Sequence, residues 1–220
     1  MQEEKSSVKR PVLLLDMDEV LCQFWEPIVR KCNRSVTDVT TWETPEWARS
    51  AFNEAMTYAH YIGLEEMPGA VSAVKHLCDK WDVYVVTHTP AANFNQNLLQ
   101  AKRQWLANRG LLTHIKGFIA TESKHLILGD VLVDDRIENC EKFHGPNRRA
   151  VLFRRPWSNV PFSHMYLVAD GWGDVMEHLA DIYPRLTAPD TKDVRPDFTQ
   201  IDAEFSELMA LVGTYGRMKY

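Results

Sequence analysis

Residues 12–20 read VLLLDMDEV, and this segment decides the fold. Four consecutive apolar residues are typical of a strand that is buried on both faces, and two carboxylates follow it as Asp16 and Asp18. The carboxyl ends of strands in open α/β sheets form the ligand crevice, so we expect both aspartates to lie there. Asp-x-Asp alone is as often a turn or helix-start signal as a site.

Further apolar runs of strand length follow, and they alternate with segments of helical period. The runs are DVYVVT at 82–87, HIKGFIA at 114–120, DVLVDD at 130–135 and AVLF at 150–153. Apolar residues recur at helical spacing within 93–110 and again after Pro68 and Gly69. This alternation predicts an α/β fold with a parallel sheet that helices cover on both faces.

The stretch between the first strand and Pro68 is rich in aromatic residues and longer than a simple crossover needs, which predicts a small inserted helical cap. The C-terminal helix could dock on its own core or on a second copy of the chain, which would make a homodimer. The expected parts are a polar tail at 1–10, a core at 11–22 and 66–183, the cap at 23–65, a proline-rich linker at 184–197 and a C-terminal amphipathic helix at 198–220.

Composition limits the classes of function. The formal net charge is -5 and the acidic residues form no tail, so we expect no extended nucleic-acid surface. No apolar run approaches the roughly 20 residues of a membrane span, and residues 1–10 precede no signal-peptide core. We therefore expect a cytoplasmic protein with no membrane partner. The four cysteines lack the paired spacing of a zinc site.

A second pair of carboxylates, Asp134 and Asp135, ends the run DVLVDD. If the two strand ends meet, four carboxylates converge, and such a cluster favours a hard cation such as Mg²⁺. Thr87 at the end of DVYVVT could donate its hydroxyl to a phosphate oxygen, and Lys124 could supply positive charge. Each residue alone has an ordinary structural explanation, but the order Asp-x-Asp, Thr, Lys, Asp-Asp is much more specific.

With these motifs the sequence resembles the haloacid dehalogenase superfamily and, within it, the 5'(3')-deoxyribonucleotidases. The resemblance runs from about residue 12 to about residue 179, through LLLDMDEVLCQF, LEEMPGAVSAVKHL, DVYVVTHTP and LGDVLVDDR. It implies a Rossmann-like core with a helical cap. It also implies a magnesium-dependent phosphatase that hydrolyses nucleoside monophosphates to nucleoside and phosphate.

The resemblance also implies roles for the aspartates. Asp16 would attack the phosphorus and become an aspartyl phosphate, while Asp18 would act as acid and base. Magnesium would be held by the Asp16 side chain, the Asp18 backbone carbonyl and Asp134, with Asp135 outside the direct ligand set. Asp130 is an alternative partner for Asp134, because the pair fits a GDxxxD spacing.

Phosphate contacts complete the implied site. Thr87 and Lys124 would hold the phosphoryl oxygens, and His88 would contact the phosphate or sugar or merely line the entrance. Three positions depart from the family's pattern. Glu19 stands where Gly is usual and could reach the cap, His88 replaces a small residue, and Glu122 stands where animal members tend to have a basic residue.

Aromatic side chains of the cap could stack on a nucleotide base. Phe24 is the best candidate because it matches the family's LADF-like segment, and Trp25 and Trp42 are further candidates. Three alternatives stay open: a DNA 3'-phosphatase, a phosphatase of another small phosphate ester, and a non-catalytic nucleotide-binding module. The acidic charge argues against the first, and the intact motif set argues against the last.

Overall fold

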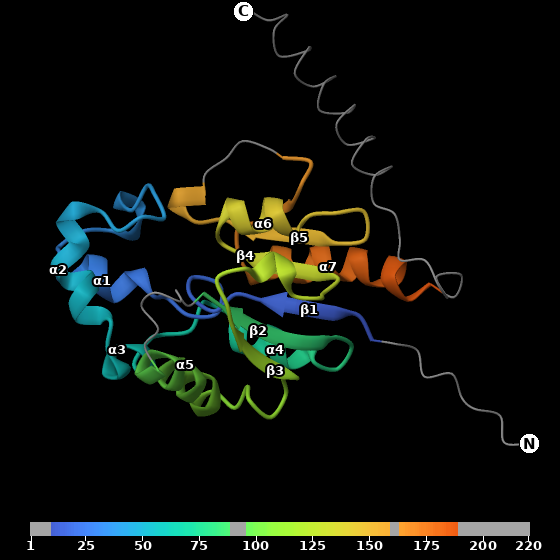
Figure 1. Ribbon diagram of the computed structural model, residues 1–220, viewed down its shortest axis with the longest axis horizontal. Helices are drawn as coiled ribbons and strands as arrows, with labels where there is room; N and C mark the ends of the chain where they lie inside the picture. Colours follow the sequence, from blue (N-terminus) through green and yellow to red (C-terminus); the bar gives the residue numbers. More distant parts are fainter. Residues whose placement is uncertain (1–9, 89–95, 159–162, 189–220) are drawn as a thin grey trace, which may run out of the picture.

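A computed structural model describes residues 10–88, 96–158 and 163–188. In these residues six strands form one sheet in the order β3-β2-β1-β4-β5-β6, and every neighbouring pair is parallel (Figure 1). The predicted parallel α/β sheet is thereby confirmed. The strands are β1 Val12–Leu15, β2 Asp82–Thr87, β3 Gly117–Ala120, β4 Val131–Asp134, β5 Arg149–Phe153 and β6 Leu167–Ala169.

Helices cover both faces of this sheet. Alternate residues of each strand point to opposite faces, so each face has its own apolar cluster. Leu13 and Leu15 of β1 join one apolar cluster, and Leu14 joins another. The first cluster takes side chains from α4 (Ala70–Leu77), α5 (Gln96–Asn108) and α7 (Trp172–Thr187). The second takes Cys140 and Phe143 from α6 (Ile137–Phe143).

The segment between β1 and α4 is helical, as predicted for the cap. It contains α1 (Trp25–Lys31), α2 (Arg49–Ala55) and α3 (Tyr58–Ile62), with single 3-10 turns at Val36–Asp38 and Glu46–Ala48. Its buried residues belong to the same cluster as one face of the sheet. Figure 1 shows these helices beyond the end of the sheet where β1 finishes. The cap therefore faces the carboxyl ends of the strands.

The expected start of the linker at residue 184 is wrong, because α7 continues past Pro184 to Thr187. Tyr183 and Leu186 pack against the main cluster, and the Tyr183 ring lies 5.4 Å from that of Trp81. These apolar contacts hold the last turn in place although Pro184 provides no N–H. The rest of the linker, the C-terminal helix expected at 198–220 and residues 1–9 of the tail lie outside the described residues.

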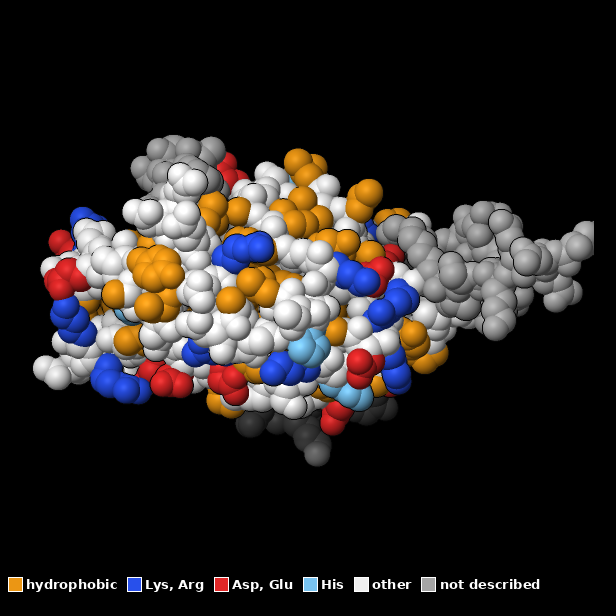
Figure 2. Space-filling view, turned by 90° about the horizontal axis from the view of Figure 1, so that it is seen from below, with side chains coloured by type: hydrophobic (Ala, Val, Ile, Leu, Met, Phe, Trp, Pro, Cys, Tyr) orange, Lys and Arg blue, Asp and Glu red, His pale blue; other side chains and the backbone are white. Residues whose placement is uncertain are grey.

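No helix in the described part of the chain is long and apolar enough to cross a bilayer. Figure 2 shows acidic and basic side chains interspersed on the face seen from below Figure 1, without a large field of one sign. All four cysteines are free thiols; Cys22 and Cys140 are buried, and Cys32 and Cys78 are partly exposed.

Candidate active site

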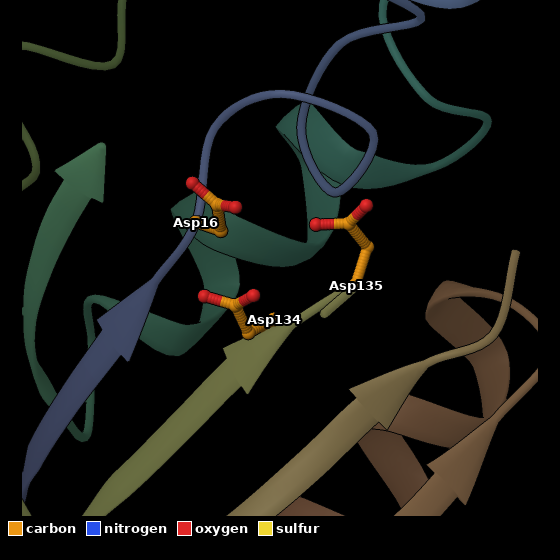
Figure 3. Close-up of side chains that lie close together, drawn as sticks. All are labelled: Asp16, Asp134 and Asp135. Atoms are coloured by element: carbon orange, nitrogen blue, oxygen red, sulfur yellow. The ribbon is translucent and has the colours of Figure 1, made fainter. Parts of the chain in front are cut away.

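Asp16 lies directly after β1, and its backbone N–H donates to the carbonyl of Val133 at 2.9 Å. This bond continues the pairing of β1 with β4, which ends at Asp134. Candidate ligand oxygens of Asp16, Asp134 and Asp135 all lie within 4.8 Å of one another, and the three residues are buried. Their carboxylates turn toward a common space (Figure 3). The predicted meeting of the two strand ends is therefore present.

Lys124 is the cation of this cluster. Its Nζ lies 2.7 Å from Asp16 Oδ1 and 2.6 Å from Asp134 Oδ2, and the side chain is 2% exposed. Burial alone would lower the pKa of Lys124, but Asp134 and Asp16 outweigh burial and hold that pKa above its ordinary value. The predicted positive charge beside the aspartates is thus present, in the form of a buried ammonium group.

The carboxylates nevertheless outnumber the cation that contacts them. Burial raises the pKa of Asp16 to about 6, with Lys124 opposing the rise and Asp134 and Asp18 adding to it. Burial, then Asp134 and Asp16, raise the pKa of Asp135 well above its ordinary value. An all-oxygen donor set with surplus negative charge fits a hard divalent cation such as Mg²⁺. The residues present therefore suit the ion that the sequence predicts.

Neighbouring groups orient the two aspartates at the end of β4, Asp134 and Asp135. Asp134 Oδ1 accepts hydrogen bonds from the backbone N–H of Arg136 at 3.0 Å and from Asn139 Nδ2 at 2.9 Å. Asp135 Oδ2 accepts one from Trp157 Nε1 at 2.8 Å. Both carboxylates offer an oxygen to the cluster, so Asp135 joins Asp134 as a candidate metal ligand.

Asp130, the alternative partner that the GDxxxD spacing offered, lies elsewhere. It directly precedes β4, so it lies at the amino ends of the strands, whereas Asp134 lies at their carboxyl ends. Its Oδ2 accepts a hydrogen bond from the backbone N–H of Val12 at 2.7 Å. The alternative that paired Asp130 with Asp134 at the site is therefore wrong, and Asp130 instead fixes the start of β1.

A second group of side chains surrounds Asp18. Lys102 Nζ donates to Asp18 Oδ2 at 2.7 Å and to Thr87 Oγ1 at 2.6 Å. Because the Thr87 oxygen accepts this bond, its own hydrogen can still be donated to a phosphate. Burial raises the pKa of the Tyr61 hydroxyl, and the negative charge of Asp18 raises that pKa further. The Asp18 side chain is 29% exposed, so it can meet a substrate, whereas metal binding by its backbone carbonyl stays a prediction.

Lys102 is the functional residue that sequence reasoning missed. It lies at a core-facing position of the helix that the sequence predicts within 93–110, and it is 4% exposed in the structure. A lysine is almost never buried to this degree without a partner. A lysine on the core-facing stripe of a helix was therefore the available signal that a carboxylate lies opposite.

His88, one of the unusual positions, follows β2 and is exposed. Partial burial lowers its pKa, and the cations Arg136, Lys124 and Lys102 lower it further, with Glu122 opposing. The imidazole is therefore favoured in its neutral form, in a positive field that would attract an anionic substrate. Its contact with phosphate stays a prediction.

The aromatic candidates differ in exposure. Phe24 and Trp25 are 6% and 5% exposed, and both belong to the main apolar cluster. Trp42 is 48% exposed, and the guanidinium of Arg136 lies 4.0 Å from its ring centroid. Because Arg136 follows Asp135, this contact brings the cap to the edge of the carboxylate cluster. Base stacking by any of the three rings stays a prediction, with Trp42 presenting the most open surface.

Comparison with known proteins agrees with this geometry. A family model described as "5' nucleotidase, deoxy (Pyrimidine), cytosolic type C protein" matches residues 10–185. The chain belongs to this family. It is accordingly a nucleotidase-type hydrolase, and the predicted family is confirmed.

Individual relatives are distant. Proteins named 5'(3')-deoxyribonucleotidase from Bacillus subtilis (strain 168) and from Bacillus phage SPbeta are each 26% identical over 155 residues, covering 67% of this chain and 87% of theirs. A haloacid dehalogenase-like hydrolase structure from Streptococcus pneumoniae has a TM-score of 0.52 at 9% identity and covers 77% of this chain and 98% of its own. One from Xanthomonas campestris has a TM-score of 0.51 at 9% identity, with 80% and 97% covered. These structures support the haloacid dehalogenase-like fold.

Proposed function

We propose that the protein hydrolyses deoxyribonucleoside monophosphates to nucleoside and phosphate, with Mg²⁺ as cofactor and an aspartyl phosphate on Asp16 as intermediate. The observation that carries this proposal is the buried cluster of three carboxylates, two of which pair with Lys124. The group formed by Asp18, Lys102 and Thr87 lies next to this cluster. The names of the two relatives above support the substrate class.

The geometry of Asp16 suits a nucleophile. Its Oδ1 accepts a hydrogen bond from the Met17 backbone N–H at 2.7 Å and lies 2.7 Å from Lys124 Nζ. Both contacts hold Oδ1, so they orient Oδ2 for attack on phosphorus. When bound, Mg²⁺ would be held by Asp16, Asp134 and Asp135 and would supply positive charge to the phosphate.

Two displacements would complete the reaction. In the first, the Asp16 carboxylate forms a bond to phosphorus while the ester oxygen leaves, and Asp18 gives that oxygen a proton. In the second, Asp18 takes a proton from water, and the resulting hydroxide attacks the same phosphorus and releases Asp16. Lys102 would hold Asp18 in place, and Thr87 would donate its hydroxyl to a phosphoryl oxygen.

A phosphate-release panel tests the proposal. Its substrates are 5' and 3' deoxyribonucleoside monophosphates, ribonucleotides, simple phosphate esters and a 3'-phosphorylated oligonucleotide, each with Mg²⁺ or with a chelator. We expect Mg²⁺-dependent release from the deoxyribonucleotides, with acid-quenched protein carrying labelled phosphate. If other esters react while no deoxyribonucleotide does, the substrate assignment fails and only the reaction class survives.

The same panel separates the alternatives. Preference for the oligonucleotide would favour a DNA 3'-phosphatase, and binding of nucleotides without any phosphate release would favour a non-catalytic module. The cytoplasmic location and the homodimer stay predictions, which cell fractionation and light scattering would check.

A further inference from the structure

We propose that Glu19 is a positioning residue, which ties the loop of Asp16 and Asp18 to the cap and, through Arg155 and Trp157, to Asp135. The proposal rests on the proposed function for its catalytic readouts, whereas its structural readouts need no substrate. Glu19 stands where the resembling family usually has glycine, so the resemblance does not account for its side chain.

The backbone of Glu19 shows why glycine is usual there. Its φ is 62°, in the left-handed region, where an L side chain is strained and glycine is not. Glutamate also brings a carboxyl group into a site where the side chain is only 3% exposed. Both effects disfavour Glu19 unless its contacts compensate. The carboxylate makes such a contact on each side.

One carboxylate oxygen reaches the cap. Glu19 Oε1 accepts a hydrogen bond from the backbone N–H of Trp25 at 2.6 Å. Trp25 is the first residue of α1, and the side chain of the preceding Phe24 makes no capping bond. The first N–H groups of a helix lack acceptors within the helix. Glu19, in the loop of Asp16 and Asp18, supplies an acceptor for the N–H of Trp25. The start of the cap is thereby fixed to the loop that carries the proposed nucleophile.

The other oxygen reaches the opposite side of the site. Glu19 Oε2 forms an ion pair with Arg155 Nη2 at 2.6 Å, and the Arg155 guanidinium lies 5.6 Å from the Trp157 ring centroid. The indole N–H of Trp157 in turn donates to Asp135, and its ring lies 6.4 Å from that of Trp25. These contacts close a ring of side chains that joins the cap, the catalytic loop and a candidate metal ligand.

Two effects follow from this ring. Loss of Glu19 would loosen the start of α1, which positions the cap over the substrate, and would also loosen Trp157, which orients Asp135. Partners that orient metal ligands typically account for about 10–100-fold in metal affinity or activity. Glu19 itself need not touch the substrate, so its loss should raise KM more than it lowers kcat.

The experiment compares Glu19→Gly, Glu19→Gln and Trp157→Phe with the wild type. Hydrogen exchange is followed in peptides covering α1, Mg²⁺ binding by calorimetry, and kcat and KM with a deoxyribonucleotide. For Glu19→Gly, which relieves the strained φ but loses both contacts, we expect exchange in α1 about tenfold faster. We also expect Mg²⁺ affinity about tenfold lower.

The other variants separate the contact of Glu19 with α1 from the contacts that lead through Arg155 and Trp157 to Asp135. Glu19→Gln keeps an oxygen for the Trp25 N–H, so α1 should exchange as in the wild type while Mg²⁺ binding weakens. Trp157→Phe should weaken Mg²⁺ binding alone. Arg154→Gln is the matched control, because Arg154 is the neighbour of Arg155 and its ion pair with Asp170 at 2.5 Å is exposed. It should leave all three readouts unchanged.

The proposal is overturned if Glu19→Gly stays within twofold of the wild type in α1 exchange and in Mg²⁺ affinity. It is also overturned if Arg154→Gln changes both as much as Glu19→Gly does. If deoxyribonucleotides are not hydrolysed by the wild type, the proposed function fails, but exchange and calorimetry still decide the role of Glu19. If Glu19→Gly does not fold, Glu19→Gln and Trp157→Phe still test the link to Asp135, and the proposal is overturned if Mg²⁺ affinity in both variants stays within twofold of the wild type.

Discussion

Asp16→Asn should have opposite effects on activity and on stability. The substitution keeps the size of the side chain but removes the charge and the nucleophilic oxygen. Burial raises the pKa of Asp16 to about 6 from its ordinary 3.8, with Lys124 opposing the rise. A raised carboxyl pKa means that folding disfavours the ionised form. The ionised side chain therefore destabilises the metal-free protein above pH 6, and this penalty disappears below pH 3.8.

The size of the effect follows from the shift. Each unit of pKa corresponds to about 1.4 kcal/mol, so the penalty at pH 7 is about 3 kcal/mol. We treat this as an upper limit for the gain in Asp16→Asn, because asparagine also gives up the attraction of Lys124. The metal-free variant should be more stable than the wild type at pH 7 by up to about 3 kcal/mol, and the difference should shrink toward pH 4.

Urea denaturation with a chelator at pH 7 and at pH 4.5 measures this difference, and phosphate release measures activity. Asp170→Asn is a suitable control, because its side chain is 63% exposed. The variant should show no turnover and no labelled intermediate. Turnover above about 1% of wild type, which corresponds to an activation barrier raised by less than about 3 kcal/mol, would remove Asp16 from the role of nucleophile. A variant less stable than the wild type at pH 7 would refute the electrostatic reasoning.

Three further predictions concern Lys102, the metal site and the packing of Gly129. Lys102→Met should lower kcat/KM about 100-fold, a loss of about 3 kcal/mol of transition-state stabilisation, because Asp18 loses its cation. Arg103→Met, at the exposed neighbouring position, should leave kcat/KM unchanged. Mg²⁺ at a hundredfold excess over its Kd should raise the free energy of unfolding by about 2.7 kcal/mol, and an unchanged urea midpoint would contradict the metal site. Gly129→Ala should cost about 1–3 kcal/mol in urea, because its Cβ would lie 2.7 Å from Leu14 Cγ. Gly145→Ala, with nothing within 4 Å, should cost little.

The sequence predicts the central strands well because β1, β4 and β5 are buried on both faces. The run DVYVVT matches β2 residue for residue, and DVLVDD contains β4. β6 has only three residues, Leu167–Ala169, and two of them are partly exposed, so it lacks the apolar run that marks a buried strand. Pro184 misled for a different reason: packing of neighbouring side chains outweighs the hydrogen bond that proline cannot make.

The candidate site was only partly predictable. Asp16 and Asp134 could be found because the carboxyl ends of neighbouring parallel strands lie together, and Lys124 because it precedes β4 in the order of the motif set. Lys102 could not be paired with Asp18 from spacing, since their contact depends on how α5 packs beside the cap. The left-handed backbone of Glu19 is likewise set by the tight loop in which its N–H bonds to the Cys22 carbonyl at 2.8 Å.

The strand order also determines when the site can exist during synthesis of the chain. β1 lies between β2 and β4, and its partner residues in β4 come more than a hundred residues later. At about 5–20 residues per second, β1 leaves the ribosome about six seconds or more before β4 can pair with it. A chain that stops short of β4 would carry Asp16 without Asp134, so incomplete products should be inert and should expose an apolar strand that molecular chaperones can bind.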